Sequence, residues 1–341
     1  MKQELLGLLH RFAGLLPLPL LIRLTGKRLF LPFYHAVQGK QTLPHIQSLY
    51  QVRTARQFEA DLDYLLRYFQ PVDMDTLAAH LLHGKALPTK AFMLSFDDGL
   101  KEVYEVAAPI LKRKGLAATV FVNSAFVDNQ ALFFRYKASL LIDAIEGKAP
   151  STTVQKRIEK QLKTIAPLHS TIRQKLLSIR FHQSEVLDQI AATLEFDFEA
   201  FLKEKQPYLS RVQLEALVQQ GFSIGAHSID HPLYEELSLD QQIDQTQESV
   251  HFVRDHFHPN FKSFAFPFSD HGVKQPFFDY LAREKITDLT FGCAGLKEDS
   301  APRHLQRYPM ERYAYDADKL VPAEYFYYLV KALFRKNRIK R

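Results

Sequence analysis

The chain has 341 residues, of which 46% are hydrophobic and 24% charged, so it has enough apolar material for a large globular core. Its single cysteine, Cys293, excludes an intramolecular disulfide framework and a cysteine-rich metal site. The net charge of +6 is mild, and no zinc finger, glycine-rich phosphate loop or aromatic RNA-binding motif accompanies it, so the sequence argues against nucleic-acid binding.

The N-terminal segment 1–28 is rich in leucine and is predicted to be helical. Its longest uncharged run, Phe12–Ile22, is shorter than the roughly 20 residues that span a bilayer, and no small-residue cleavage site of a signal peptide follows it. We expect this segment to pack on the protein's own surface, with an amphipathic helix lying on a membrane as the alternative. The lack of a signal peptide predicts a cytoplasmic location, with peripheral association at the inner face of the membrane as an extension of that prediction.

Apolar runs alternate with amphipathic helical patterns over most of the chain. This alternation predicts a parallel sheet covered by helices, that is, an α/β fold. The predicted strands are 29–35, 91–96, 117–122, 222–226, 263–266 and 289–291. The predicted helices outside 134–208 are 54–69, 74–82, 100–114, 211–219, 240–257 and 277–284.

Between about 134 and 208 the alternation stops, and helical patterns follow one another without a strand. We interpret this stretch as a helical insertion between two strands of the sheet. A separate domain is the alternative, but no flexible glycine- or serine-rich linker flanks the stretch. The predicted organisation is therefore a helical segment at 1–28, a domain at 29–315 that contains the insertion, and a C-terminal helix with a basic tail at 316–341.

Two adjacent carboxylates, Asp97 and Asp98, stand where the strand 91–96 ends, and Gly99 follows them. Asp-Asp-Gly is good turn chemistry, and Asp98 could simply cap the next helix. Two neighbouring carboxylates, however, stay ionised only at a cost unless a positive charge lies beside them. The pair therefore indicates a metal or another cation at the carboxyl end of a strand, where open α/β sheets place their sites.

Two histidines four residues apart, His227 and His231, directly follow the strand 222–226. Pro232 comes next and disfavours the α conformation at His231, so we expect the histidines in a tight turn and not on a helix. In a chain with 14 histidines, such a pair in a loop can also occur by chance. Because the two strands are predicted to be parallel, the carboxylates and the histidines should open on the same rim.

One aspartate and two histidines can form a zinc site that leaves coordination positions free for water and substrate, as catalytic zinc sites do. The second aspartate could then act as a general base. Phe266, Pro267 and Phe268 end the strand 263–266 with a rigid aromatic turn that could form a wall of the site and offer backbone N–H groups. A proline at this position can also be a simple strand stop.

Together, these segments resemble the polysaccharide deacetylases of the NodB-homology type, carbohydrate esterase family 4. Ser95–Gly99 is similar to the first motif of that family, His227–His231 to the second, and Phe266–Phe268 to the third in its arginine-lacking form. The strand that ends in Tyr34 and His35 is similar to the Tyr-His opening of many members. The resemblance covers about 30–310 apart from the helical insertion.

The resemblance implies a distorted (β/α) barrel, more often of seven strands than of eight. It implies that Asp98, His227 and His231 bind a divalent metal, most often Zn²⁺, and that Asp97 is the base that activates a metal-bound water toward an acetamide carbonyl. The metal and the backbone N–H of Phe268 would hold the oxyanion, and Phe266, Pro267 and Phe268 would contact the substrate.

Two parts of the family pattern are missing at the matching positions. Ala265 stands where the family often has an arginine that orients the base, and the candidates to replace it are Arg307, Arg312 and Arg135. The late Leu-x-His motif that supplies the general acid is absent, and the candidates to protonate the leaving amine are His35, His271 and His304.

The sequence therefore predicts a metal-dependent deacetylase that removes the N-acetyl group of an amino sugar in a polysaccharide or glycoconjugate, during envelope polysaccharide synthesis. The alternatives are a catalytically inactive glycan-binding relative and an amidohydrolase that acts on a non-sugar amide. The expected partner is a carbohydrate substrate. The basic tail at 331–341, which includes Leu333 and Phe334, could contact an anionic membrane, with a solvated, partly disordered tail as the alternative.

Overall fold

The computed structural model describes residues 16–163, 165, 169–311 and 315–341. Eight parallel strands form a nearly closed barrel in the order β13-β11-β10-β9-β8-β7-β2-β14. In chain order they are β2 (Pro32–Tyr34), β7 (Ser95–Phe96), β8 (Thr119–Val122), β9 (Ser223–Ala226), β10 (Ser263–Ala265), β11 (Leu289–Gly292), β13 (His304–Gln306) and β14 (Tyr308–Pro309). The predicted α/β fold with a distorted barrel is confirmed, with eight strands where the family resemblance favoured seven.

The register of the central strands aligns their carboxyl ends. Ser95 pairs with Phe33 on one side and with Thr119 on the other, and Val122 pairs with Ala226. The loops after β2, β7 and β9 therefore open on one rim of the barrel, as predicted for the carboxylate pair and the two histidines.

The barrel nearly closes at its edge strands β13 and β14, which a single residue, Arg307, separates in sequence. β13 pairs with β11 and β14 pairs with β2, so the chain passes from one edge of the sheet to the other at this residue. The two strands have three and two residues and β14 includes Pro309, so the sequence shows no strand pattern there. Arg307 thus lies where the two edges of the barrel meet.

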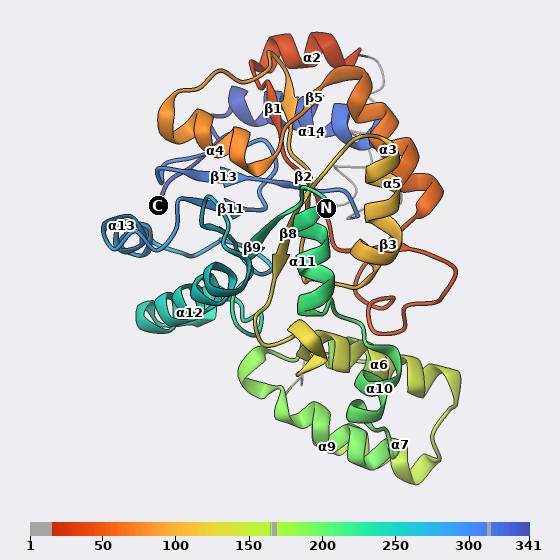
Figure 1. Ribbon diagram of the computed structural model, residues 1–341. Coiled ribbons are helices and arrows are strands. Elements are labelled where there is room, and N and C mark those ends of the chain that lie inside the picture. Colours follow the sequence, from red (N-terminus) through yellow and green to blue (C-terminus); the bar gives the residue numbers. More distant parts are fainter. Residues whose placement is uncertain (1–15, 164, 166–168, 312–314) are drawn as a thin grey trace.

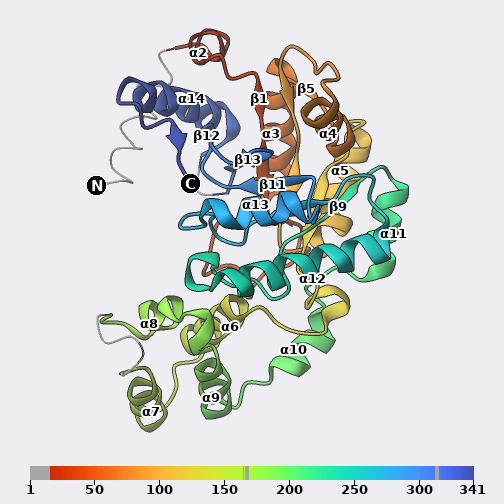
Figure 2. The same ribbon diagram turned by 90° about the vertical axis from the view of Figure 1, so that its left-hand side faces the viewer.

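Most helices that cover the barrel lie where their apolar stripes predict them (Figures 1 and 2). They are α3 (Ala55–Tyr68), α4 (Met74–His83), α5 (Ala108–Arg113), α11 (Arg211–Gln219), α12 (Leu239–Phe257) and α13 (Gln275–Arg283). Thr54 begins α3 in a capping box with Gln57, and Gly84 ends α4 in the left-handed conformation.

The helix predicted over 100–114 is interrupted. A π-helical turn, Val103–Ala107, precedes α5, and Pro109 stands in the first turn of α5. Because proline has no N–H, the hydrogen bond that a continuous α-helix would make from this position to the carbonyl of Glu105 is missing. No side chain caps the start of this helix, so the alternative role of Asp98 as a helix cap is wrong.

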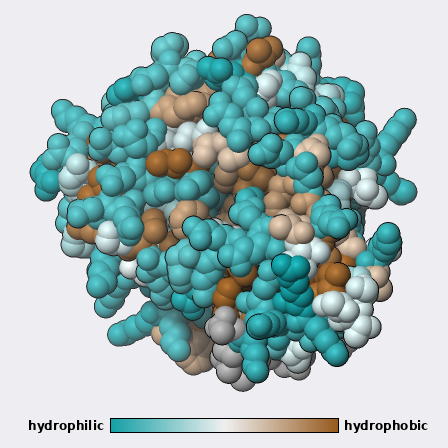
Figure 3. Space-filling model, turned by 90° about the horizontal axis from the view of Figure 1, so that it is seen from below, coloured by the Kyte–Doolittle hydropathy of each residue, from teal (hydrophilic) through white to brown (hydrophobic). Residues whose placement is uncertain are grey.

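The helical insertion forms a layer at one end of the molecule (Figures 1 and 2). Its helices are α6 (Phe134–Gly147), α7 (Thr152–Lys163), α8 (Ile172–Ser178), α9 (Glu185–Leu194) and α10 (Phe198–Lys205). Their buried side chains form a hydrophobic cluster that includes Leu140, Ile158 and Leu187 and extends to Leu43 and Ile46 of the α/β part. Hydrophilic residues cover most of the face seen from this end, with hydrophobic residues between them in smaller groups (Figure 3).

Besides the barrel, the described residues form three small sheets, two of which come from residues 29–92. One contains β1 (Leu29–Phe30), β6 (Ala91–Phe92) and β5 (Gln70–Pro71), and the other contains β3 (Val37–Gln38) and β4 (Arg53–Thr54). The predicted strands 29–35 and 91–96 are therefore each split between a small sheet and the barrel. At the breaks, Leu31 and Met93 are buried in an apolar cluster with Phe121 and Phe291, which accounts for the continuous apolar runs in the sequence.

The helix α2 (Leu18–Thr25) packs against the long helix α14 (Ala317–Leu333). Leu18, Leu21 and Ile22 of α2 are buried, so this part of the N-terminal segment lies on the protein's own surface as expected, and residues 1–15 lie outside the described part. Among the described helices, none is long and apolar enough to cross a membrane.

The C-terminal tail is more ordered than the alternative prediction of a solvated, partly disordered tail. β15 (Arg338–Ile339) pairs in parallel with β12 (Glu298–Asp299), and the side chain of Arg341 is only 3% exposed. The alternative of a solvated, partly disordered tail is therefore wrong for 338–341, because strand pairing and ion pairs hold these residues. Leu333 and Phe334 remain 82% and 70% exposed, and their contact with a membrane stays a prediction, as does the cytoplasmic location.

Candidate active site

Asp98, His227 and His231 meet on the rim at the carboxyl ends of β7 and β9. The Nε2 atoms of His227 and His231 lie 3.5 and 3.2 Å from Asp98 Oδ1. All three side chains are buried, and the two imidazole centroids are 4.9 Å apart. The structure thus brings together the three residues that were predicted as metal ligands, and it places the histidines in a turn and not on a helix.

Left-handed backbone conformations shape this rim. Asp98, His231 and Phe268 have φ values of 69°, 65° and 53°. A non-glycine residue in this region costs on the order of 1–3 kcal/mol, and such residues cluster at functional sites. Gly99 has a φ of 64°, and a β-carbon there would lie 3.0 Å from a methyl group of Val122, so the turn after the carboxylates requires glycine.

Hydrogen bonds beneath the rim hold the histidine turn. Ser228 Oγ accepts from the backbone N–H of His231 over 3.0 Å and from Asn123 Nδ2 over 3.3 Å. His227 Nδ1 lies 2.8 Å from the carbonyl oxygen of Ala265, to which it donates. This hydrogen bond leaves Nε2, the atom that faces Asp98, as the nitrogen available to bind a metal.

The donor atoms fit a divalent metal. Asp98 Oδ1 is buried and has no hydrogen-bond partner among the described residues, which is costly unless a cation compensates it. Burial raises the pKa of the Asp98 carboxyl, but His231 and His227 lower it by a larger amount, so the pKa lies well below its ordinary value. Burial also lowers the pKa of His231 by more than Asp98 raises it. The site thus offers an ionised carboxylate and a neutral imidazole, the protonation states that bind metals.

A tyrosine from the first helix of the insertion supports Asp98. Tyr136 Oη donates to Asp98 Oδ2 over 2.6 Å and lies 3.1 Å from Tyr50 Oη. The buried ring of Tyr136 also stacks on that of Tyr208, with centroids 6.0 Å apart. Because Oδ2 is engaged in this way, Oδ1 is the atom that Asp98 presents to the histidines. The insertion therefore takes part in orienting a candidate metal ligand.

Replacing Tyr136 by phenylalanine should lower the affinity for a divalent metal by about 10- to 100-fold, because Asp98 loses the hydrogen bond that orients it. Calorimetric titration of chelator-stripped protein with Zn²⁺ measures the change. Tyr68→Phe on α3 is the matched control and should bind Zn²⁺ as the unmodified protein does. Equal affinity of the Tyr136→Phe variant and the control would contradict the role given to Tyr136.

Asp97 lies beside the triad and is paired with Arg307. The Nη1 and Nη2 atoms of Arg307 donate to the two carboxylate oxygens of Asp97 over 2.6 and 2.7 Å. The guanidinium lies 4.4 Å from the ring centroid of Phe33 and 5.0 Å from that of Phe121, and Arg307 is only 1% exposed. Burial raises the pKa of Asp97, but Arg307 and His227 lower it by a larger amount, so the carboxylate is ionised at neutral pH.

The other two candidate arginines do not take this position. Arg135 donates to the carbonyl oxygen of Leu177, and its guanidinium lies 5.7 Å from the ring centroid of Phe268. Arg312 lies outside the described residues. Of the arginines proposed to orient the base, Arg307 is the one that the structure places on Asp97.

His35 follows β2 and faces the cleft that contains Asp97 and Asp98. Its Nδ1 atom lies 2.6 Å from Glu311 Oε2, and its ring stacks on that of Tyr50 with centroids 4.3 Å apart. Burial lowers the pKa of His35, but the Glu311 carboxylate raises it, and the resulting pKa is about 9. His35 is therefore a protonated imidazolium near neutral pH, with Nε2 turned away from its carboxylate partner.

The other two candidate acids have different surroundings. The His271 side chain is 80% exposed, with Glu235 3.3 Å away. His304 is buried, with Nε2 3.0 Å from Asp270 Oδ2 and Nδ1 2.8 Å from the hydroxyl of Thr290. Both nitrogens of His304 are thus engaged away from the triad, and His35 is the candidate that combines a place in the cleft lining with a raised pKa.

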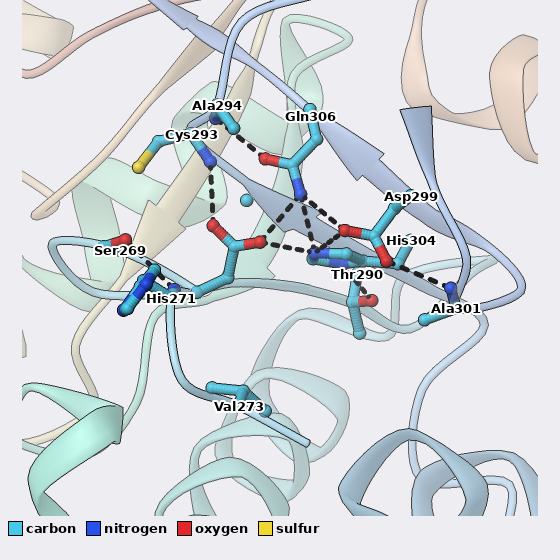
Figure 4. A network of polar contacts seen from close by, with 12 residues as sticks. Ser269, His271, Val273, Thr290, Cys293, Ala294, Asp299, Ala301, His304 and Gln306 are labelled. Atoms are coloured by element: carbon cyan, nitrogen blue, oxygen red, sulfur yellow. Dashed lines mark hydrogen bonds and ion pairs between the residues drawn. The ribbon is translucent and has the colours of Figure 1, made fainter. Parts of the chain in front are cut away.

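A second polar cluster surrounds Asp270, and Figure 4 shows Asp299, His304 and Gln306 turned toward one another in it. Asp270, Asp299 and His304 are close enough together to hold an ion. The guanidinium of Arg341, however, already donates to both carboxylates. We interpret this cluster as an anchor for the loop that follows Phe268, with Arg341 supplying the positive charge.

A cleft of about 1170 Å³ opens over the triad. Phe268 lines it, is 40% exposed, and has its ring centroid 4.5 Å from that of His231. The backbone N–H of Phe268 donates to no other described residue. Phe266 is only 2% exposed and packs its ring against Tyr234, and Pro267 is buried as well. Of the three residues predicted to contact substrate, Phe268 presents the most surface to the cleft.

The sequence did not reveal Tyr136 or Glu311 as residues of the site. Tyr136 lies in the first turn of α6, far from both motifs in the chain, and no local spacing indicates its contact with Asp98. Glu311 lies two residues after β14, and β14 pairs with β2, the strand that His35 follows. Recognition of β14 as a strand would have placed Glu311 beside His35.

A family model for polysaccharide deacetylase matches residues 84–283, more than half of the chain, and this span contains the triad, Asp97 and Phe268. The chain therefore belongs to the polysaccharide deacetylase family. Members of this family are hydrolases that act on carbon–nitrogen bonds other than peptide bonds.

Solved structures of deacetylases share the fold. The deacetylase PplD of Streptococcus pyogenes, in complex with acetate, is 15% identical with a TM-score of 0.54, and the match covers 87% of this chain and 98% of that one. IcaB from Ammonifex degensii is 17% identical with a TM-score of 0.52 (88% and 98% covered). A de-N-acetylase from Aggregatibacter actinomycetemcomitans is 14% identical with a TM-score of 0.52 (87% and 100% covered). No curated protein sequence matches the chain.

Proposed function

We propose that this deacetylase hydrolyses the N-acetyl group of an amino sugar in a polysaccharide or glycoconjugate and that the triad holds Zn²⁺ for this purpose. One observation carries the proposal. The buried, unpartnered Asp98 Oδ1 faces two histidine Nε2 atoms, directly beside the Asp97–Arg307 pair. Two imidazoles and one carboxylate suit zinc and leave coordination positions free.

Each neighbouring group has a role in the proposed reaction. Asp97 takes a proton from the attacking water as general base, and Arg307 fixes the orientation of its carboxylate. The N–H of Phe268 donates to the amide oxygen as negative charge develops there. His35 gives its Nε2 proton to the departing nitrogen, so that the carbon–nitrogen bond breaks to leave acetate and a free amine.

When bound, the metal supplies Lewis-acid polarisation and lowers the pKa of a coordinated water, which suits a base with a pKa as low as that of Asp97. The presence of a base, a set of metal ligands and an acid in one cleft favours an active enzyme over the alternative of an inactive glycan-binding relative. Asp97, Arg307, His35 and Phe268 are all in place around one cleft.

The proposed acid predicts a pH dependence. His35 must be protonated to act, so activity should fall as the pH rises through its pKa, which is about 9 without a metal and lower beside a bound cation. Replacing Glu311 by glutamine removes the main influence that raises this pKa, while burial continues to lower it. The alkaline limb of the pH–rate profile should therefore move to lower pH by at least about one unit. An unchanged limb in the Glu311→Gln variant would show that His35 is not the acid.

Acetate release from a series of N-acetylglucosamine oligomers tests the function itself. The zinc-reconstituted full chain should release acetate, the release should stop on chelation, and it should return when Zn²⁺ is added back. If the protein binds zinc and the oligomers but releases no acetate from any of them, the result contradicts the proposal and supports the glycan-binding alternative.

A further inference from the structure

The cleft over the triad continues past Phe268 to a second end, which we call the basic end. Three chain segments meet there, and each contributes one lysine to the lining. Lys274 closes the loop that follows Phe268, Lys297 precedes β12, and Lys340 follows Ile339 in the C-terminal strand β15. Strand pairing holds two of these segments side by side, because β12 and β15 are neighbours.

The three lysines at the basic end are not neutralised by the protein. Their ammonium groups form no ion pair and donate no hydrogen bond to any residue within the described ranges. The two carboxylates that line this end are engaged otherwise. Asp270 accepts from Arg341, His304 and Gln306, and Glu324 accepts from the backbone N–H of Leu296 over 2.9 Å. The basic end therefore carries net positive charge inside a concave site.

Positive charge in a cleft concentrates anions there, and low-dielectric walls strengthen the effect. The contrast with the two cations nearest Asp97 and Asp98 is informative, because each of them is paired with a carboxylate. Arg307 is bound to Asp97 and His35 to Glu311. Three lysines from three chain segments act as point charges that suit a tetrahedral phosphate, whereas planar carboxylates favour the fork of an arginine.

We propose that the basic end binds a phosphate or diphosphate group of the substrate, so that the substrate is an N-acetylated amino sugar that also carries a phosphate. This inference rests on the proposed function, because it takes the triad end of the same cleft as the place of the acetyl group. The phosphate can belong to a soluble sugar phosphate or to a diphosphate that links the sugar to a lipid. Both present the same anion to Lys274, Lys297 and Lys340.

Equilibrium binding tests this inference without requiring turnover. Calorimetry on the zinc-loaded full chain should find that N-acetylglucosamine 1-phosphate binds at least about tenfold more tightly than N-acetylglucosamine at low salt. A charge-assisted contact contributes about one such tenfold step (~1.4 kcal/mol). The difference in affinity should shrink in about 0.5 M salt, because salt screens these contacts. A prenyl diphosphate carrying the same sugar distinguishes the two sources. Tighter binding of the prenyl diphosphate assigns the site to a lipid-linked substrate, and equal binding assigns it to the phosphate alone.

Variants at Lys297 connect the preference to the basic end. Lys297→Ala should reduce the ratio of the two affinities several-fold, and Lys297→Arg, which retains the charge, should preserve most of it. Lys203→Ala removes a lysine charge from α10, away from the cleft lining, where Lys203 lies beside Glu199, and should leave the ratio unchanged.

Two results would overturn the inference. One is equal affinity for the phosphorylated and the neutral sugar. The other is equally tight binding of an N-acetylated sugar acid, which would replace the phosphate by a carboxylate. Failure of the proposed function is separate and looks different, because the phosphate preference would then persist in calorimetry while no sugar releases acetate.

Discussion

Replacing Asp97 by asparagine should slow acetate release by about 10²- to 10⁴-fold, the range that a positioned general base contributes. Asparagine has nearly the same shape and can still accept a hydrogen bond from Arg307, but it cannot take a proton from water. Steady-state kinetics on an N-acetylglucosamine oligomer that the unmodified protein deacetylates measure the effect. The loss should appear in kcat, since Asp97 acts on the attacking water and not on the bound sugar.

The control for this prediction is metal content. Asp98, His227 and His231 remain intact in the Asp97→Asn variant, so its metal content should equal that of the unmodified protein. If the variant retains its metal and also keeps its rate within about threefold, a group other than Asp97 is the base.

Replacing Arg307 by methionine should destabilise the fold by about 3–5 kcal/mol, the usual cost of leaving one partner of a buried ion pair without its countercharge. Asp97 would stay 3% exposed beside the apolar rings of Phe33 and Phe121 with no arginine to neutralise it. Denaturant unfolding followed by circular dichroism gives the free energy of unfolding. Activity should also fall, because nothing then fixes the carboxylate of Asp97.

A double variant separates the charge effect from lost packing. Asp97→Asn combined with Arg307→Met removes both charges, so it should be more stable than Arg307→Met alone. If the two single changes simply add in their effect on the free energy of unfolding, the two side chains are not energetically coupled, and the account of their pairing fails.

The sequence predicted those parts of the site that depend on strand ends. Asp97, Asp98, His227 and His231 each follow a strand with a clear apolar run, and parallel strands bring their carboxyl ends together. The turn at His227–His231 could be predicted as well, because Pro232 restricts the backbone of the residue before it. The central strands and most barrel helices were predictable for the same reason, since their periodic patterns are local.

The supporting residues depend on contacts that no local pattern records. Arg307 reaches Asp97 because it lies between the two edge strands of a nearly closed barrel, and those strands are too short to be seen in the sequence. Tyr136 reaches Asp98 from the helical insertion, whose position relative to the rim is set by tertiary packing. For the arginine and the acid, the sequence offered three candidates each, and only the three-dimensional arrangement distinguishes them.

The order of the C-terminal tail also depends on contacts that the local sequence does not indicate. A short run of basic residues near a chain end suggests a solvated segment, but Arg341 is buried between Asp270 and Asp299. The partners lie 71 and 42 positions earlier in the chain, so no local feature of 331–341 indicates them.

The central claim is that Asp98, His227 and His231 hold a catalytic metal, and the most direct test is metal content by mass spectrometry on protein purified without chelators. The unmodified chain should contain about one zinc-class ion per molecule, and Asp98→Ala and His231→Ala should each lose it while keeping their circular dichroism spectra. The contradicting result is a well-folded unmodified protein that contains no metal and takes up none from added Zn²⁺, or a metal that both variants retain.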